Sequence, residues 1–155
     1  MGFMDKIKGA MNAVTGHSAK VNFEFSPIMA MPGDRLTVKV TATSTGLEVA
    51  SKGVFIDLHG LEKIMIKSGA VLGVNADVRA EKAVMEQAFP IAPAFTLGKG
   101  ESKTWEAQIQ IPANAQPTYQ GNFTNHEWKI RGRVQATGVD PHSEYLPIKI
   151  GAKPN

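Results

Sequence analysis

The stretch LTVKVTAT, residues 36–43, decides the fold class of this sequence. Its apolar residues alternate with polar ones without a break, and β-branched side chains occupy both sets of positions. A period of two is typical of a β-strand that buries one face and exposes the other. The stretch therefore predicts a strand of an antiparallel sheet.

The same alternation recurs along most of the chain. It predicts further strands at 21–25, 54–58, 105–111, 128–136 and 146–150. Six or more such strands without a strong central helix indicate two packed sheets. We therefore expect an all-β protein, a two-sheet antiparallel β-sandwich of immunoglobulin-like type.

Four segments between these strands carry weaker signals. Residues 64–66 indicate a short strand, whereas residues 76–87 fit either a helix or a strand. Two prolines exclude a central strand at 90–97, so an edge position is expected there. Gly98-Lys99-Gly100 indicates a hairpin turn between 90–97 and 103–111.

The first sixteen residues follow a different period. Apolar residues three or four positions apart predict a short amphipathic helix within 1–16, spanning 3–15, ahead of a single domain at 17–155. The helix would dock on an anionic membrane surface, dock in a partner's groove, or pack on its own sandwich. The residues that would dock are Phe3, Met4, Ile7 and Met11.

The composition describes one globular domain that is mildly basic. The chain has 155 residues, of which 43% are hydrophobic and 20% charged, with a net charge of +3. No run of like charges is present, so we expect no nucleic-acid partner. Since no apolar stretch is long enough for a membrane span and the N-terminus has no secretory pattern, a cytoplasmic location is expected.

Several chemistries have no support in the residue types. The chain has no cysteine, which excludes disulfides and thiolate sites. Its four histidines are scattered, whereas a zinc site needs about three or four converging ligands, so no metal or cofactor is expected. No nucleophile–base motif is visible, and we expect no enzyme; a site assembled from loops is the catalytic alternative.

The most specific stretch is IPANAQPTYQG, residues 111–121. Its prolines restrict the backbone, its asparagine favours a turn, and its last glycine allows a positive φ. Its tyrosine offers a ring to bury and a hydroxyl to bond a nearby backbone group, as at the corner of a sandwich. The residues of this motif are Pro112, Asn114, Pro117, Tyr119, Gly121 and, in the next strand, Trp128.

This motif resembles part of the N-terminal arrestin domain. In both, a strand ending in Ile-Pro is followed by Asn, Pro, a hydroxyl residue, Tyr and Gly, and then by an aromatic strand. Phe25-Ser26-Pro27, followed by Pro32-Gly33-Asp34, resembles the opening of that domain. The short helix ahead of a first strand at Lys20-Val21 resembles the bacterial sporulation-control (SpoOM-type) branch of the arrestin-like family.

The resemblance implies a sandwich that serves as a protein-interaction adaptor or scaffold in sporulation, stress or cell-division control. Arrestins have a second sandwich after the first, and this sequence ends at Asn155, so no two-domain motion is expected within one copy. Other proteins are the expected partners, bound by loops or by strand addition at an edge such as 20–27 or 145–150. The same edges predict a homo-oligomer. The alternative is a peripheral membrane protein that docks through its N-terminal helix.

One strand carries a row of positive charges. Lys129, Arg131 and Arg133 occupy alternate positions and therefore share one outward face. This row could bind an acidic peptide, a phosphate or an anionic lipid. It could equally be an ordinary solvated face whose charges protect the sheet.

Overall fold

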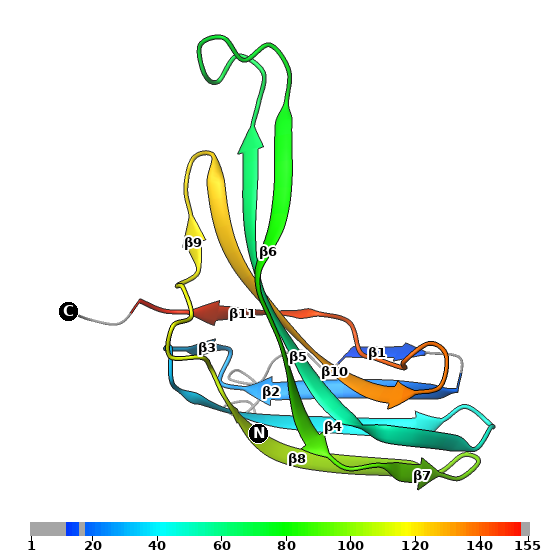
Figure 1. The fold of residues 1–155 in the computed structure, drawn as a ribbon. Coiled ribbons are helices and arrows are strands. Elements are labelled where there is room, and N and C mark those ends of the chain that lie inside the picture. Colours follow the sequence, from blue (N-terminus) through cyan, green and yellow to red (C-terminus); the bar gives the residue numbers. More distant parts are fainter. Residues whose placement is uncertain (1–11, 16–17, 153–155) are drawn as a thin grey trace.

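The computed structural model describes residues 12–15 and 18–152. These residues form strands and no helix, and the strands lie in two sheets (Figure 1). In chain order the strands are β1 (Asn12–Thr15), β2 (Ala19–Ser26), β3 (Met29–Ala30), β4 (Arg35–Ser44), β5 (Val49–Ile66), β6 (Val78–Ala92), β7 (Phe95–Leu97), β8 (Ser102–Gln110), β9 (Tyr119–Gln120), β10 (Thr124–Ala136) and β11 (Leu146–Ile150). The all-β prediction is confirmed for this part of the chain.

The smaller sheet contains the stretch at 36–43. Its strand order is β1-β2-β4-β8, and all neighbours are antiparallel. The four apolar residues of β4 at positions 36, 38, 40 and 42 are completely buried, and the residues between them face outward. The alternation in the sequence thus corresponds to one face against the core and one face in solvent.

The larger sheet is built around two long strands, β5 and β10. They pair antiparallel from Thr124 opposite Ile64 to Ala136 opposite Ser51. β11 follows on the far side of β10, with the short β3 parallel to it, and β6 forms the edge beyond β5. The remaining strands, β7 and β9, pair with β5 and β10.

The two sheets pack face to face around an apolar core. Gly132 of β10 permits a close approach at the centre, because a Cβ there would lie 3.0 Å from Val40 Cγ2 and 3.2 Å from the Phe23 ring of the opposite sheet. The large, fully buried side chains of this core include Leu36, Ile56, Leu58, Leu97, Ile111, Ile130 and Ile150. The structure therefore confirms the predicted arrangement of two packed sheets.

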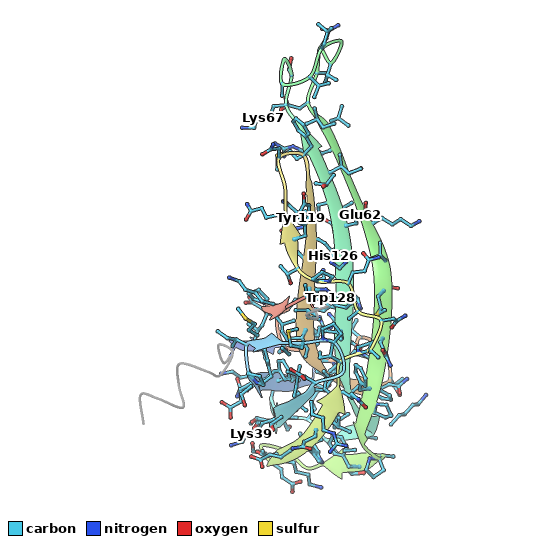
Figure 2. The ribbon with its side chains drawn as sticks, turned by 90° about the vertical axis from the view of Figure 1, so that its left-hand side faces the viewer. Lys39, Glu62, Lys67, Tyr119, His126 and Trp128 are labelled. Atoms are coloured by element: carbon cyan, nitrogen blue, oxygen red, sulfur yellow. The ribbon has the colours of Figure 1, made fainter. Side chains whose placement is uncertain are left out.

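The larger sheet continues beyond the sandwich as an arm. We define the arm as residues 61–84, which comprise the end of β5, the loop 67–77 and the start of β6 (Figures 1 and 2). It begins where the β5–β6 register shifts between Gly60 and Leu61, an irregularity that bends a strand. From residue 67 to residue 84 every side chain except Val74 is exposed. Most of the segment 76–87, ambiguous in sequence, belongs to the arm, and the segment forms a strand from residue 78 onward.

The predicted N-terminal helix is wrong where the structure describes it. Residues 12–15 form β1, which pairs antiparallel with residues 20–23 of β2. β-branched Val14 and Thr15 favour an extended backbone, and the side of β2 offers hydrogen-bond partners. Residues 20–23 of β2 are therefore flanked on both sides, which contradicts the edge expected at 20–27 for this part of the strand, whereas residues 24–26 pair with β4 alone among the described residues. The rest of the predicted helix lies outside the described residues.

The strands at the sheet edges also differ in part from expectation. β11 is covered by β10 on one side and, at Lys149 and Ile150, by β3 on the other, so it is at most a partial edge. The edge position expected for 90–97 is confirmed for Pro90, which lies in β6 opposite Phe55. The long open edge of the larger sheet belongs to β6.

The turn at Gly98-Lys99-Gly100 joins two sheets instead of two neighbouring strands. The Glu101 amide donates to the Gly98 carbonyl at 3.0 Å, so the predicted turn is present. β7 before it pairs with β5, however, and β8 after it pairs with β4. The predicted hairpin is wrong because Phe95 and Trp105, with ring centroids 4.6 Å apart, pack against each other and the core between the sheets.

Candidate functional site

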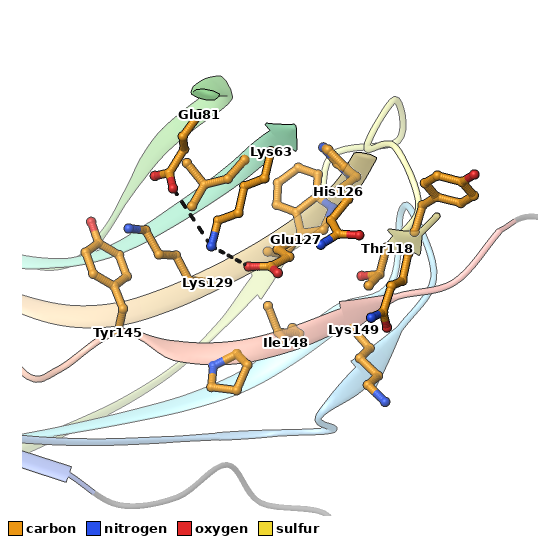
Figure 3. A pocket seen from close by; sticks show the side chains of 15 residues that line it. Lys63, Glu81, Thr118, His126, Glu127, Lys129, Tyr145, Ile148 and Lys149 are labelled. Carbon is orange, nitrogen blue, oxygen red and sulfur yellow. Dashed lines mark ion pairs between the residues drawn. The ribbon is translucent and has the colours of Figure 1, made fainter. Parts of the chain in front are cut away.

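A groove of about 540 Å³ opens at the base of the arm (Figure 3). It lies where two strands follow each other along the same side of β10. β9 pairs with residues 125–126 and β11 with residues 128–130, so Glu127 has no strand partner on that side. Sites of roughly 300–1,000 Å³ are typical of ligand binding, and the groove falls within this range.

The chain segments on the two sides of the groove are tied together at one end. The Thr118 amide donates to the Ile150 carbonyl at 2.7 Å, and the Ile150 amide donates to Thr118 Oγ1 at 2.9 Å. These bonds connect the segment before β9 to the end of β11. The groove is therefore bounded by ordered backbone instead of by a free loop.

The floor of the groove is apolar, and its interior holds one lysine between two glutamates. Leu61 and Ile148 line it and are almost completely buried. Lys63 Nζ lies 2.9 Å from a Glu127 carboxylate oxygen and 3.8 Å from one of Glu81 (Figure 3). The hydrogen bond to Glu127 is the main reason that the pKa of Lys63 lies above its ordinary value. Three strands thus place two acids around one base, so these three side chains together carry one formal negative charge.

One wall of the groove is Tyr145 with two cations on its ring. Lys129 Nζ lies 4.3 Å and the Arg131 guanidinium 4.5 Å from the ring centroid, within the range of a cation–π interaction. The hydroxyl lies 3.2 Å from His59 Nε2. Burial raises the pKa of Tyr145 and lowers that of His59, so both are neutral at pH 7.

Beside this wall, the predicted row of positive charges forms a neutralised cluster. Asp57 of β5 accepts hydrogen bonds from Arg131 Nε at 2.9 Å and from Arg133 Nε and Nη2 at 2.9 and 3.1 Å. Arg133 also donates to Asp140 at 2.9 Å. Burial alone would raise the pKa of the Asp57 carboxyl, but the two guanidinium groups outweigh it and hold the pKa below its ordinary value. We call these four residues the Asp57 cluster.

The Asp57 cluster changes the interpretation of the row Lys129, Arg131 and Arg133. The three side chains share one face of the sheet, as the sequence predicted, but two of them are committed to carboxylates. Lys129 lies on Tyr145 and has no carboxylate partner among the described residues. Recognition of an acidic ligand by this row stays a prediction, and Lys129 is the member that could carry it.

The motif at 111–121 forms the crossover between the sheets. Pro112 and Asn114 belong to a turn closed by the Ala115 amide and the Pro112 carbonyl at 3.0 Å. Trp128 Nε1 donates to the Gln116 carbonyl at 2.8 Å, and His126 Nδ1 donates to the Pro117 carbonyl at 3.0 Å. Two ring nitrogens of β10 therefore hold this segment on the sheet (Figure 2).

Two details of that motif differ from the prediction. The Tyr119 side chain is 57% exposed, so its ring is not a buried corner. Gly121 does not have a positive φ; instead, a Cβ there would lie 2.5 Å from the Tyr119 hydroxyl and 2.9 Å from its ring. Glycine is needed at this position because the Tyr119 ring lies against it. The opposite face of the ring is open to a ligand.

The residues predicted to dock on a membrane or a partner lie near the N-terminus. Phe3, Met4, Ile7 and Met11 lie outside the described residues, so their membrane or partner docking stays a prediction. Among the residues that the structure describes, no helix is long and apolar enough to span a membrane. The described acids and histidines likewise form no group of three or more that could hold a metal ion.

The sequence did not reveal the groove. Lys63, Glu81 and Glu127 are far apart in the chain, and only the pairing of β5 with β6 and β10 brings them together. Tyr145 was not singled out because it precedes the last strand without any recognisable motif.

Comparison with known proteins supports the fold. No protein-family model and no curated protein matches the chain. Among solved structures, the crystal structure of Spo0M, a sporulation control protein from Bacillus subtilis, superposes with a TM-score of 0.62 and 18% sequence identity. The fold of this chain resembles that of Spo0M.

The match to Spo0M covers 90% of this chain and 51% of the Spo0M chain. This chain therefore spans about half the length of Spo0M. At 18% identity the likeness shows the fold alone. The expected likeness to a sporulation-control protein is therefore confirmed for the fold.

Proposed function

We propose that this chain is a non-catalytic adaptor of arrestin-like type that binds an extended segment of a partner protein in the groove at the base of the arm. The resemblance to the bacterial sporulation-control family, and the likeness to a sporulation control protein, support a regulatory role in sporulation, stress or cell-division control in the cytoplasm. The observation that carries the proposal is the combination of an apolar floor with cations at both ends of one groove.

The apolar part of the groove suits one side chain of a partner. Leu61 and Ile148 provide the floor, and the rings of Tyr119 and Tyr145 line the groove above it. Aromatic rings at a concave site bury an inserted apolar side chain with little loss of conformational entropy. We therefore infer an apolar or aromatic anchor residue in the bound segment.

The charges around the groove favour an acidic segment. Lys129 lies at the Tyr145 end, and exposed Lys149 lies at the Thr118 end (Figure 3). Lys63 with Glu127 and Glu81 leaves one formal negative charge inside the groove. Carboxylates of a bound segment would therefore lie at the two ends of the groove, beside the outer lysines. The expected ligand is an extended peptide whose apolar anchor has carboxylates on both sides.

The test is selection of peptides by the intact chain. A library of random linear peptides is panned against the purified protein, and enriched peptides are synthesised and titrated. We expect enrichment of an apolar residue flanked by Asp or Glu. Lys149→Glu should weaken binding of these peptides about tenfold or more, because it replaces an attraction with a repulsion.

The matched control is Lys99→Glu, which makes the same charge change on the turn between β7 and β8. It should leave the affinity unchanged. Because Lys149 and Lys99 are both exposed, neither change should disturb folding. Peptides without an acidic pattern, or peptides that bind the Lys149→Glu variant as well as the natural chain, would overturn the proposal.

A further inference from the structure

The upper part of β6 is an open sheet edge. β6 is the last strand of the larger sheet, and no described residue pairs with its outer side there. Residues 78–84 are exposed on both faces. An edge of this kind offers unpaired N–H and C=O groups to any strand that aligns with it.

If this edge pairs antiparallel with the same edge of a second copy, positive side chains can lie opposite negative ones. Arg79 and Glu81 lie two residues apart, opposite Met65 and Lys63 of β5, and so share one face. Ala80 lies between them on the other face. Glu81 remains 55% exposed despite its ion pair with Lys63. One positive and one negative charge thus lie symmetrically about a small residue.

A two-fold axis perpendicular to the sheet pairs two such edges antiparallel and keeps each face continuous. If the axis passes through Arg79, Glu81 or Lys82, a charge lies directly opposite its own copy, which destabilises a strand pair. If it passes through Ala80, Arg79 of each copy lies opposite Glu81 of the other. Registers centred farther along β6 meet the irregularity at Val84.

We propose that two copies of this chain pair through their β6 edges, centred on Ala80, to form one continuous antiparallel sheet. The arm carries this edge away from the sandwich (Figure 1), so the axis places the two sandwiches at opposite ends, where they do not collide. The same register sets the loop 67–77 of each copy beside the lower part of β6 of the other. Glu81 also lines the groove, whereas Arg79 does not, so the Arg79→Glu variant tests the pairing apart from the groove.

Charge reversal on the edge tests the pairing. Sedimentation equilibrium of the intact chain should show a dimer. Arg79→Glu and Glu81→Arg, each alone, should raise the dimer dissociation constant about tenfold or more, because both symmetric pairs become like-charged. The double variant Arg79→Glu/Glu81→Arg should recover the dimer. Glu48→Arg makes the same charge change in the exposed turn between β4 and β5; it is the control and should leave the dimer unchanged.

A cross-link tests the register. Because the natural chain has no cysteine, a single introduced thiol reports one position. Cα atoms of residues directly opposite in an antiparallel pair lie about 4.5–5.5 Å apart, which a disulfide can span. Oxidation should therefore convert Ala80→Cys to a covalent dimer. Ala83→Cys should stay monomeric on a denaturing gel, since its two copies would lie about 20 Å apart.

Three outcomes of these two measurements would contradict the pairing. A natural chain that stays monomeric at the highest attainable concentration overturns the proposal. So does a double charge reversal that fails to restore the dimer, or Ala83→Cys cross-linking as readily as Ala80→Cys. Loss of peptide binding in the groove would affect the proposed function and leave these results unchanged.

Discussion

The sandwich and the arm are built from the same strands under opposite conditions. Within the sandwich, Val54, Ile56 and Leu58 of β5 are completely buried against the smaller sheet. A few residues later, Met65 of the same strand is 44% exposed. The residues of β6 that pair with this part of β5 are exposed as well, because no second sheet covers them. Backbone pairing between β5 and β6 thus continues beyond the point where their side chains are buried. The arm retains its ladder of hydrogen bonds without an apolar core of its own.

The largest difference between the two regions should appear on truncating an apolar side chain in each. Phe23 is completely buried, and its ring stacks on Phe25 at 5.7 Å. Phe23→Ala should lower the free energy of unfolding by about 3–5 kcal/mol, measured by urea denaturation. Leu72→Ala, at the fully exposed tip of the arm, should change it by no more than about 0.5 kcal/mol. Equal effects would contradict the division into core and arm.

A smaller loss of stability is expected on removing the charge of Asp57, which is buried beneath two arginines on the outer face of the larger sheet. Asp57→Asn leaves Arg131 and Arg133 without their shared carboxylate, and should cost about 3 kcal/mol at pH 7. The pKa of Asp57 is lowered in the folded chain, so its contribution is full above the unfolded pKa of about 3.9. It is lost as the pH falls through the folded pKa.

The pH dependence separates this charge effect from a general loss of packing. The difference in unfolding free energy between the natural chain and Asp57→Asn should be constant from pH 7 to about pH 4 and shrink below it. Glu48→Gln, which alters an exposed carboxylate, is the control and should leave stability unchanged. A difference that persists unaltered at pH 2 would show that ionisation of Asp57 is irrelevant.

The smallest of the three effects is expected at the junction of sandwich and arm. A Cβ at Gly60 would lie 2.9 Å from Trp128 Cη2, and the indole is held by its bond to Gln116. Gly60→Ala should therefore cost about 1–3 kcal/mol and shift the tryptophan fluorescence. Gly98→Ala is the control, because its Cβ would meet only the Glu101 carboxylate at 3.6 Å. An unshifted spectrum would mean that the indole adapts freely.

The same contrast explains how far the sequence predicted the fold. Strands with a buried face, such as 36–43 and 128–136, were recognisable because burial imposes a period of two. β6 buries little, and its Ala, Glu and Lys residues also suit a helix, so 76–87 stayed ambiguous until its pairing with β5 was known. At residues 12–15, an open strand edge outweighed a helical spacing.

The site was less predictable than the fold. The crossover at 111–121 was recognised because prolines and glycine constrain the backbone locally. The contacts of Lys63 with Glu127 and of Asp57 with Arg131 join residues more than 60 positions apart in the chain, and they depend on a register that no local pattern specifies. The sequence also predicted a solvated or ligand-binding row at 129–133, because it could not show that Asp57 lies opposite Arg131.

The unbroken course of β5 from the core to the tip makes the arm a spacer of adjustable length. Adding two residues to each of its strands would lengthen it by about 7 Å and keep every side chain on its present face. Adding one residue to each would turn Arg79 and Glu81 to the opposite side of the sheet. Insertions between residues 61 and 84 should therefore be tolerated in pairs, and the separation between two joined sandwiches would grow in steps instead of continuously.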